Sequence, residues 1–182
     1  LNGGAGNDLL IGGEGADQLS GGAGFDTASY EDANQGISVT INLKTGVHTG
    51  LAAGDTFNGI EAFRGTAWGD SFVADATATT FDGAGGYDTV SYATSDQAIN
   101  LTLNGVNGTG LGGDAQGDAF TSIDAIVGTA FDDVFNLNSG STSVSGGAGN
   151  DVYIINGAWT GGIGESAGGG FDEIRTNQLN VS

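Results

Sequence analysis

Apolar side chains recur every nine residues in three stretches of the chain, and glycine and polar residues fill most positions between them. The stretches are residues 3–29, 65–91 and 128–154, and the first divides into GGAGNDLLI, GGEGADQLS and GGAGFDTAS. The eighth position of each nine is usually large and apolar: Leu10, Leu19, Ala28, Phe72, Phe81, Val90, Phe135, Val144 and Tyr153. A fixed period predicts a repeat architecture in which each unit packs on its neighbours.

A longer period is superimposed on the nine-residue one. GFDTASY at 24–30 returns as GYDTVSY at 86–92, about 62 residues later. The intervening segments, 30–64 and 92–127, each contain an alternating apolar run, which predicts a half-buried β-strand. The two runs are Ile37-Val39-Ile41-Leu43 and Ile99-Leu101-Leu103.

Each nine-residue unit has the composition of a turn followed by a short strand. Glycine adopts positive φ without steric cost, so the first six residues favour a turn, while the last three suit a strand. Two units then form a coil of 18 residues, and stacked coils pair their strands about 4.8 Å apart. The predicted fold class is all-β. It is a parallel β-roll, or right-handed β-helix solenoid, made of nine-residue half-turns and joined by linkers that contain strands.

The composition indicates that this thin-cored roll needs an additional source of stability. The 182 residues include 37 Gly, and 22 acidic residues against 3 basic ones give a net charge of −19. Ordering glycine costs more entropy than ordering other residues, and like charges oppose compaction. We therefore expect disorder without a cation. The shortage of basic residues argues against nucleic-acid or anionic-membrane binding, and no apolar run is long enough for a membrane span.

The sixth position of the nine suggests which cation. Aspartates at this position form pairs 18 residues apart, which places them on the same edge of successive coils: Asp8 and Asp26, Asp70 and Asp88, Asp133 and Asp151. Such carboxylates would repel one another in a poorly solvated turn, and a hard cation between them reverses the interaction. Ca²⁺ takes six to eight oxygen ligands, including backbone carbonyls, and suits this site better than Mg²⁺. Transition metals prefer imidazole or thiolate, and the chain has one His and no Cys.

The alternative is that aspartate only caps turns. That reading explains isolated aspartates such as Asp55 and Asp114 better than a metal does, but it does not explain three pairs at spacing 18.

The units GGAGNDLLI, GGEGADQLS and GGAGNDVYI resemble the GGxGxDxUx nonapeptide of RTX (repeats-in-toxin) proteins, a Ca²⁺-binding β-helix repeat. The resemblance covers most of residues 1–175 and is strongest at 3–11, 12–20, 21–29 and 146–154. It implies that each ion lies between two turns on one edge, held by carbonyls and aspartates of both. By position, it implies the following ligands: Gly3, Ala5, Asp8, Gly22, Gly24 and Asp26 for one site; Gly65, Ala67, Asp70, Ala84, Gly86 and Asp88 for a second; Gly128, Ala130, Asp133, Gly147, Gly149 and Asp151 for a third; and Gly13, Gly15 and Asp17 for a half-site.

Departures from the pattern limit the number of sites. The residue 18 positions after Asp17 is Gln35, so we expect its partner upstream, lost because the chain looks like an excised fragment. Thr79 and Thr142 stand where the acid should be, so one edge of the later blocks should be weak or empty. Calcium sites should be most secure in 3–29. GGGFDEI at 168–174 resembles a degenerate repeat in which Asp172 is a further candidate ligand.

The resulting organisation has six segments: an RTX β-roll block at 1–29, a linker with β-strands at 30–64, an RTX-like block at 65–91, a second such linker at 92–127, an RTX block at 128–154, and a degenerate repeat with a truncated C-terminal part at 155–182. Outside the aspartates, His48 is expected to be a solvated loop residue. Trp68 and Trp159 are expected to cap core ends, and Tyr30 and Tyr92 to close block ends.

The resemblance also implies a setting. RTX proteins are typically exported unfolded by type I secretion in Gram-negative bacteria, and they fold when they meet extracellular Ca²⁺. We expect a secreted or cell-surface module that serves folding, secretion and scaffolding in a larger bacterial protein, with calcium as cofactor. The alternatives are a surface-interaction segment, such as an adhesin stalk or S-layer-like module, or an accessory domain of a secreted protease, lipase or polysaccharide-modifying enzyme. No catalytic constellation is legible, so the chain itself is not expected to be an enzyme.

Overall fold

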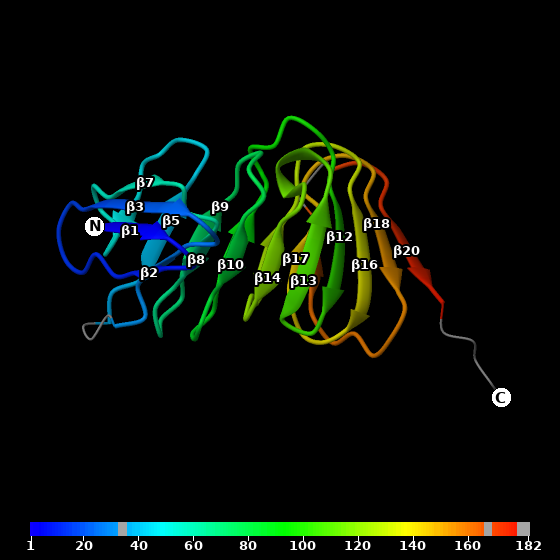
Figure 1. The fold of residues 1–182 in the computed structure, drawn as a ribbon. Coiled ribbons are helices and arrows are strands. Elements are labelled where there is room, and N and C mark those ends of the chain that lie inside the picture. The colour runs from blue at the N-terminus through cyan, green and yellow to red at the C-terminus, as the bar shows by residue number, and fades with distance from the viewer. Residues whose placement is uncertain (33–35, 166–168, 178–182) are drawn as a thin grey trace.

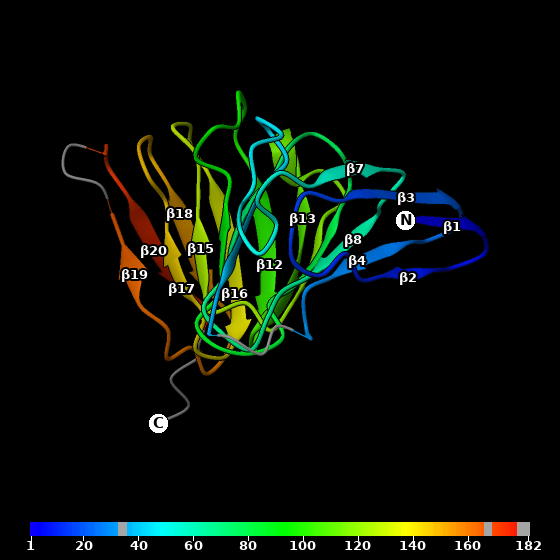
Figure 2. The ribbon, with the colours of Figure 1, turned by 90° about the vertical axis from the view of Figure 1, so that its left-hand side faces the viewer.

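Short strands alternate between facing sheets along the length of the molecule, as the nine-residue units predict (Figures 1 and 2). The computed structural model describes residues 1–32, 36–165 and 169–177. Within these ranges the secondary structure is almost entirely β, apart from the 3₁₀ turn η1 (Gly113–Ala115). The first strands lie at one end of the stack and β20 at the other (Figure 1). No helix of the described ranges is long and apolar enough to cross a membrane.

The described strands form three sheets. The longest has the order β2 (Leu9–Leu10), β4 (Thr27–Ser29), β8 (Ala62–Arg64), β10 (Thr80–Asp82), β14 (Ala119–Thr121), β13 (Asn107–Leu111), β12 (Asn100–Asn104), β16 (Val134–Ser139), β18 (Val152–Ile155) and β20 (Glu173–Thr176). The second has the order β19 (Ile163–Gly164), β17 (Ser143–Ser145), β15 (Ala125–Val127), β11 (Thr89–Ser91), β9 (Ser71–Val73), β5 (Val39–Asn42) and β6 (Thr49–Gly50). The third joins β1 (Asn2–Ala5), β3 (Gln18–Ala23) and β7 (Thr56–Asn58).

The strand register confirms the coil of 18 residues. Phe63 pairs with Phe81 in parallel, and Phe135 pairs with Tyr153 in the same way. Each pair joins the eighth positions of units that are one coil apart. The fold is therefore a parallel β-roll, and the short strands stack so that equivalent side chains lie above one another.

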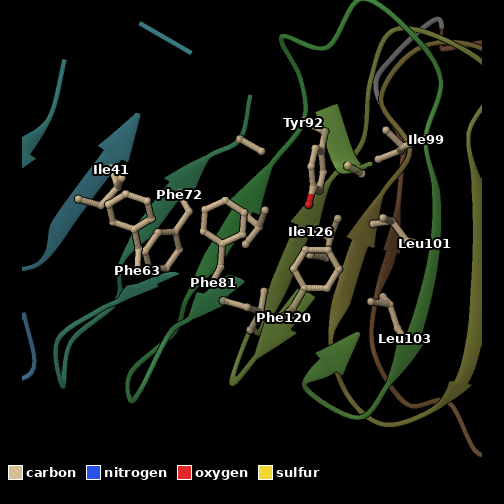
Figure 3. Close-up of a cluster of buried hydrophobic side chains, with 14 of the residues drawn as sticks. Ile41, Phe63, Phe72, Phe81, Tyr92, Ile99, Leu101, Leu103, Phe120 and Ile126 are labelled. Atoms are coloured by element: carbon tan, nitrogen blue, oxygen red, sulfur yellow. The ribbon is translucent and has the colours of Figure 1, made fainter. Parts of the chain in front are cut away.

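The eighth-position side chains form the core between the sheets (Figure 3). All nine are buried, with at most 4% of their surface exposed. Phe72 of β9 and Phe81 of β10 meet across the two long sheets with ring centroids 5.3 Å apart. Burying a large apolar side chain contributes about 1.5–3 kcal/mol. The core is thus continuous, but it is only one side-chain layer deep on each sheet.

The segments predicted as linkers contribute strands to the same sheets. The alternating runs form β5 and β12, with Ile41 and Leu101 fully buried. β5 turns back as an antiparallel hairpin with β6, and β12, β13 and β14 form an antiparallel meander inside the long sheet. β8 continues the stack between β4 and β10. The roll thus runs through both linkers, each of which adds antiparallel strands.

Two of the single-residue expectations need correction or detail. The prediction of a solvated His48 was wrong: the ring is only 8% exposed, because its Nδ1 accepts the Asn42 N–H at 3.1 Å and the ring packs on Phe57. Trp159 packs against the core, whereas Trp68 is half exposed.

Candidate metal sites

A column of carboxylates follows each edge of the roll, and each carboxylate directly precedes a strand. Each carboxylate accepts a hydrogen bond from a backbone N–H of the coil before it, at 2.7–3.1 Å. We call this set the carboxylate ladder: Asp26, Asp55, Glu61, Asp70, Asp88, Asp118, Asp124, Asp133, Asp151 and Asp172. The three predicted pairs are adjacent in it, since the N–H groups of Asp8, Asp70 and Asp133 donate to the aspartate 18 residues later.

In each ladder carboxylate, one oxygen accepts the backbone hydrogen bond, which leaves the other oxygen available for a different partner. One oxygen ties a coil to the previous coil's backbone, which is the role expected of a turn aspartate. The second oxygen then decides whether the residue needs a cation.

Five second oxygens of the described residues are buried without any hydrogen-bond partner: Oδ2 of Asp8, Asp17, Asp26, Asp88 and Asp151. Burying an unpartnered carboxylate oxygen is costly, because the charged group loses its water without compensation. A hard divalent cation offers the missing interaction, and carboxylate oxygens are its preferred ligands. The donor set of these turns therefore fits Ca²⁺.

The first glycine of each nonapeptide makes room for the carboxylate of its own turn. A Cβ added at Gly3, Gly21 or Gly146 would lie 2.0–2.5 Å from Oδ2 of the aspartate five residues later. Any side chain at this position would displace that oxygen. The glycine–aspartate spacing thus holds Oδ2 inside the turn.

The glycines at the second and fourth positions of the nonapeptide have a different role. Gly22 and Gly24 have φ of 110° and 146°, and an added Cβ would lie 2.1 Å from the carbonyl oxygens of Gly4 and Gly6 in the previous coil. Both conformation and contact therefore require glycine. The unit at 83–91 keeps a left-handed residue at the second position, where Ala84 has φ 65°.

The remaining residues predicted to supply carbonyls lie in the same nonapeptides, and Ala5 is the last residue of β1. They are Ala5, Gly13, Gly15, Gly65, Ala67, Gly86, Gly128, Ala130, Gly147 and Gly149. Which of these carbonyls bind an ion stays a prediction.

In two turns that lack glycine at the second and fourth positions, a threonine donates hydrogen bonds to both oxygens of the aspartate. In GTAWGD, the Thr66 N–H donates to Asp70 Oδ2 at 2.6 Å, and its hydroxyl lies 3.1 Å from both carboxylate oxygens. In GTAFDD, Thr129 donates to Asp133 in the same way, at 2.7 and 2.9 Å. These turns lack the left-handed residues at the second and fourth positions. In the second and third pairs, the unpartnered oxygen therefore belongs to Asp88 and Asp151.

In a second group of ladder aspartates, a tyrosine hydroxyl donates a hydrogen bond to the second oxygen. One member of this group, Asp55, changes the expectation for Asp17. Asp55 accepts the Asp17 N–H at 2.8 Å and the Tyr30 hydroxyl at 2.5 Å, so it is the partner of Asp17 in the next coil. The chain therefore contains a partner for Asp17, and Asp55 is not an isolated turn residue. The two residues are 38 apart and not 18, because about 20 additional residues lie between them, and this hid the pair from the nine-residue register.

The second copy repeats the tyrosine arrangement with threonine in place of Asp17. Asp118 accepts the Thr79 N–H and the Tyr92 hydroxyl, both at 2.8 Å. Asp118 was missed at the sequence level. The 62-residue period was the signal that could have found both tyrosine–aspartate pairs.

Burial makes ionisation of several ladder aspartates unfavourable when no cation is bound. Burial, reinforced by neighbouring carboxylates, raises the pKa of Asp88 to about 7 and that of Asp151 to about 6. Burial also raises the pKa of Asp70 and Asp133, although the hydrogen bonds that each accepts from backbone and threonine oppose the shift. A bound cation would restore the charged form.

The chain's own cations do not neutralise the unpartnered aspartates. Lys44 pairs with Asp114 at 2.7 Å, Arg175 pairs with Glu173 at 2.7 Å, and Arg64 pairs with Glu31 at 3.0 Å. Asp114 is thus a buried ion-pair partner in η1. The three basic residues in the sequence therefore have other carboxylate partners.

Comparison with protein-family models matches residues 1–28 and 118–153 to the RTX calcium-binding nonapeptide repeat, in four copies. The match confirms the resemblance inferred from the nonapeptides. Its ranges include the two stretches with intact GGxGxD turns and leave out 65–91. No match was found among curated proteins.

Proposed function

The chain carries the calcium-binding nonapeptide repeat of the RTX family over residues 1–28 and 118–153, and from this premise we propose that it is a calcium-binding β-roll module whose folding depends on the ion. The observation that carries the proposal is the set of five buried, unpartnered aspartate oxygens. They combine high local negative charge with a donor type that Ca²⁺ prefers.

We assign calcium ligands according to whether the carboxylate oxygen that does not bind the backbone N–H has a hydrogen-bond partner. Asp8 and Asp26 both have a free oxygen and form the most complete pair. Asp88 and Asp151 each contribute one free oxygen, while Asp17 forms a half-site at the other edge. The carbonyls predicted from the resemblance complete each coordination shell in this proposal.

Calcium binding supplies the stability that the thin core lacks. A site that binds only the folded state contributes about 2.7 kcal/mol when the free ion is at one hundred times its Kd. Several such sites are comparable to the whole stability of an ordinary domain, about 5–15 kcal/mol. Without the ion, glycine entropy and a net charge of −19 favour the open chain.

This coupling suits a protein that is exported before it folds. In the cytosol, where calcium is scarce, the acidic chain would stay unfolded and competent for a type I secretion channel. Outside the cell, calcium would fold it into a structural module of a larger extracellular bacterial protein. The proposed role is therefore folding and scaffolding rather than catalysis.

Calcium titration of aspartate-to-asparagine variants tests the ligand assignment. Asn keeps the shape and one acceptor oxygen, so the ladder hydrogen bond is retained while the charge is lost. Asp26→Asn and Asp88→Asn should each lower the number of bound Ca²⁺ ions or weaken one class of site at least tenfold. The control is Asp96→Asn, which removes the same charge from an exposed position outside the ladder. Calcium binding by Asp26→Asn and Asp88→Asn that equals the control would refute the assignment.

A further inference from the structure

A cluster of three carboxylates lies beyond the last intact nonapeptide. Asp151, Glu165 and Asp172 each offer a carboxylate oxygen, and the three oxygens lie within 4.8 Å of one another. They come from three different segments: Asp151 precedes β18, Glu165 follows β19 and Asp172 precedes β20. Glu165 lies outside the nonapeptide register, so the repeat pattern alone does not identify it.

The buried member of the cluster has an oxygen without a partner. Asp151 is fully buried, and one oxygen accepts the Asp133 N–H at 2.7 Å while Oδ2 has no hydrogen bond. Both oxygens of Asp133, in contrast, accept hydrogen bonds, from Thr129 and from the Ile99 N–H. The free oxygen of the Asp133–Asp151 pair therefore belongs to Asp151 alone.

The position of Gly146 places this free oxygen beside Glu165. A Cβ added at Gly146 would lie 2.0 Å from Asp151 Oδ2 and 2.5 Å from the Tyr153 hydroxyl. That hydroxyl donates a hydrogen bond to Glu165 Oε1. Asp151 Oδ2 and the hydroxyl of Tyr153 thus both lie next to the Cα of Gly146. The absence of a side chain at residue 146 leaves room for both groups.

No basic side chain of the protein compensates this cluster. Arg175, the basic residue closest to it in the sequence, pairs with Glu173, and Lys44 and Arg64 pair with carboxylates elsewhere. Three carboxylates at this separation repel strongly unless a counter-charge lies among them. Oxygen-only ligands and a flexible geometry favour Ca²⁺ over Mg²⁺ or a transition metal.

We propose that Asp151, Glu165 and Asp172 bind one Ca²⁺ ion, with Tyr153 as the residue that positions Glu165. The inference rests on the proposed calcium-binding function and deepens it: the ion at Asp151 Oδ2 gains two further carboxylates, one of them from outside the repeat. The ion would tie β19 and β20 to the 128–154 block. The spacing of 21 between Asp151 and Asp172 replaces the usual 18.

Calcium titration of the full chain, followed by calorimetry, tests this site. Glu165→Gln should remove one equivalent of bound Ca²⁺ or weaken one site at least tenfold, and leave the other sites unchanged. Glu31→Gln removes the same charge from an exposed position remote from the cluster and should bind like the wild type. Tyr153→Phe should keep the stoichiometry and weaken the same site several-fold, because Glu165 loses the hydrogen bond from the Tyr153 hydroxyl.

The outcomes separate this proposal from the general one. A wild-type chain that binds no Ca²⁺ would refute the proposed function. A wild type that binds Ca²⁺, together with a Glu165→Gln variant indistinguishable from Glu31→Gln, would overturn only the site at Glu165. Glu165 and Asp172 are exposed, so neither substitution should prevent folding. Asp172→Asn provides the second variant and should affect the same equivalent as Glu165→Gln.

Discussion

Ala84 has a backbone conformation that equivalent units give to glycine, so exchanging it with its neighbour should stabilise the fold. Ala84 has φ 65°, whereas Gly22 and Gly147 at the same position of their units have φ of 110° and 105°. Gly85 does not have a positive φ, and a Cβ added there would meet Ala67 Cα at 3.7 Å, an ordinary contact. The double variant Ala84→Gly/Gly85→Ala restores the order GGAG without changing the composition.

The magnitude follows from the conformational cost alone. A left-handed residue with a Cβ costs roughly 1–2 kcal/mol relative to glycine. The usual entropy cost of adding glycine cancels to first order, because the exchange keeps the number of glycines constant. The unfolding free energy should therefore rise by about 1–2 kcal/mol. For a chain of this size that corresponds to a Tm increase of about 2–8 °C.

Thermal and denaturant unfolding in saturating calcium provide the assay. The matched control is the opposite exchange in an intact unit, Gly147→Ala/Ala148→Gly. A Cβ at 147 would lie 2.1 Å from the Thr129 carbonyl oxygen, so this variant should lose about 2 kcal/mol or more. If the 84/85 exchange left Tm unchanged or lowered it while the control behaved as expected, Ala84 would not be strained and the reasoning would fail.

Three further predictions concern ladder residues whose environment differs. Burial raises the pKa of Asp88 and of Asp118 to about 7, above the values of the unfolded chain, so these residues favour the metal-free fold at low pH and this stability is lost as pH rises through 7. Each should favour the metal-free fold by about 1 kcal/mol more at pH 6 than at pH 8. The β-sheet circular-dichroism signal in chelator should therefore be larger at pH 6 than at pH 8, and an equal signal at both would contradict this. Thr66→Val should lower the unfolding free energy by about 1–2 kcal/mol, because Asp70 loses its hydroxyl donor. Thr77→Val is the exposed control, and equal effects of the two substitutions would show that the Thr66 hydroxyl contributes nothing. Tyr92→Phe should cost about 1–3 kcal/mol, because Asp118 Oδ2 loses its buried donor, and a variant as stable as the wild type in thermal unfolding would exclude that role.

The periodic features of the fold were predictable from the sequence because they depend on local composition and a fixed spacing. Apolar residues at the eighth position, such as Phe72 and Phe81, are buried as the register requires. The coil of 18 residues is seen directly in the pairing of Phe63 with Phe81. The alternating runs around Ile41 and Leu101 are strands.

The remaining features depend on contacts across insertions, which a nine-residue period does not encode. Asp55 meets Asp17 across the segment that contains the β5–β6 hairpin, so their spacing along the chain departs from the register. His48 is buried because its loop returns to Asn42. The threonine cap at Asp70 was not predicted, because the spacing of the repeat indicates which aspartates can bind an ion but not which protein donor replaces the ion.

Circular dichroism of the full chain at neutral pH, first in excess chelator and then with millimolar Ca²⁺, tests the central claim most directly. Because five buried aspartate oxygens lack a partner, the chain should show a disordered spectrum in chelator and acquire a β-sheet spectrum when Ca²⁺ is added. The same concentration of Mg²⁺ should produce little change, because Mg²⁺ demands octahedral geometry and retains its waters. A β-sheet spectrum that persists unchanged after thorough chelation would contradict the coupling of calcium binding to folding.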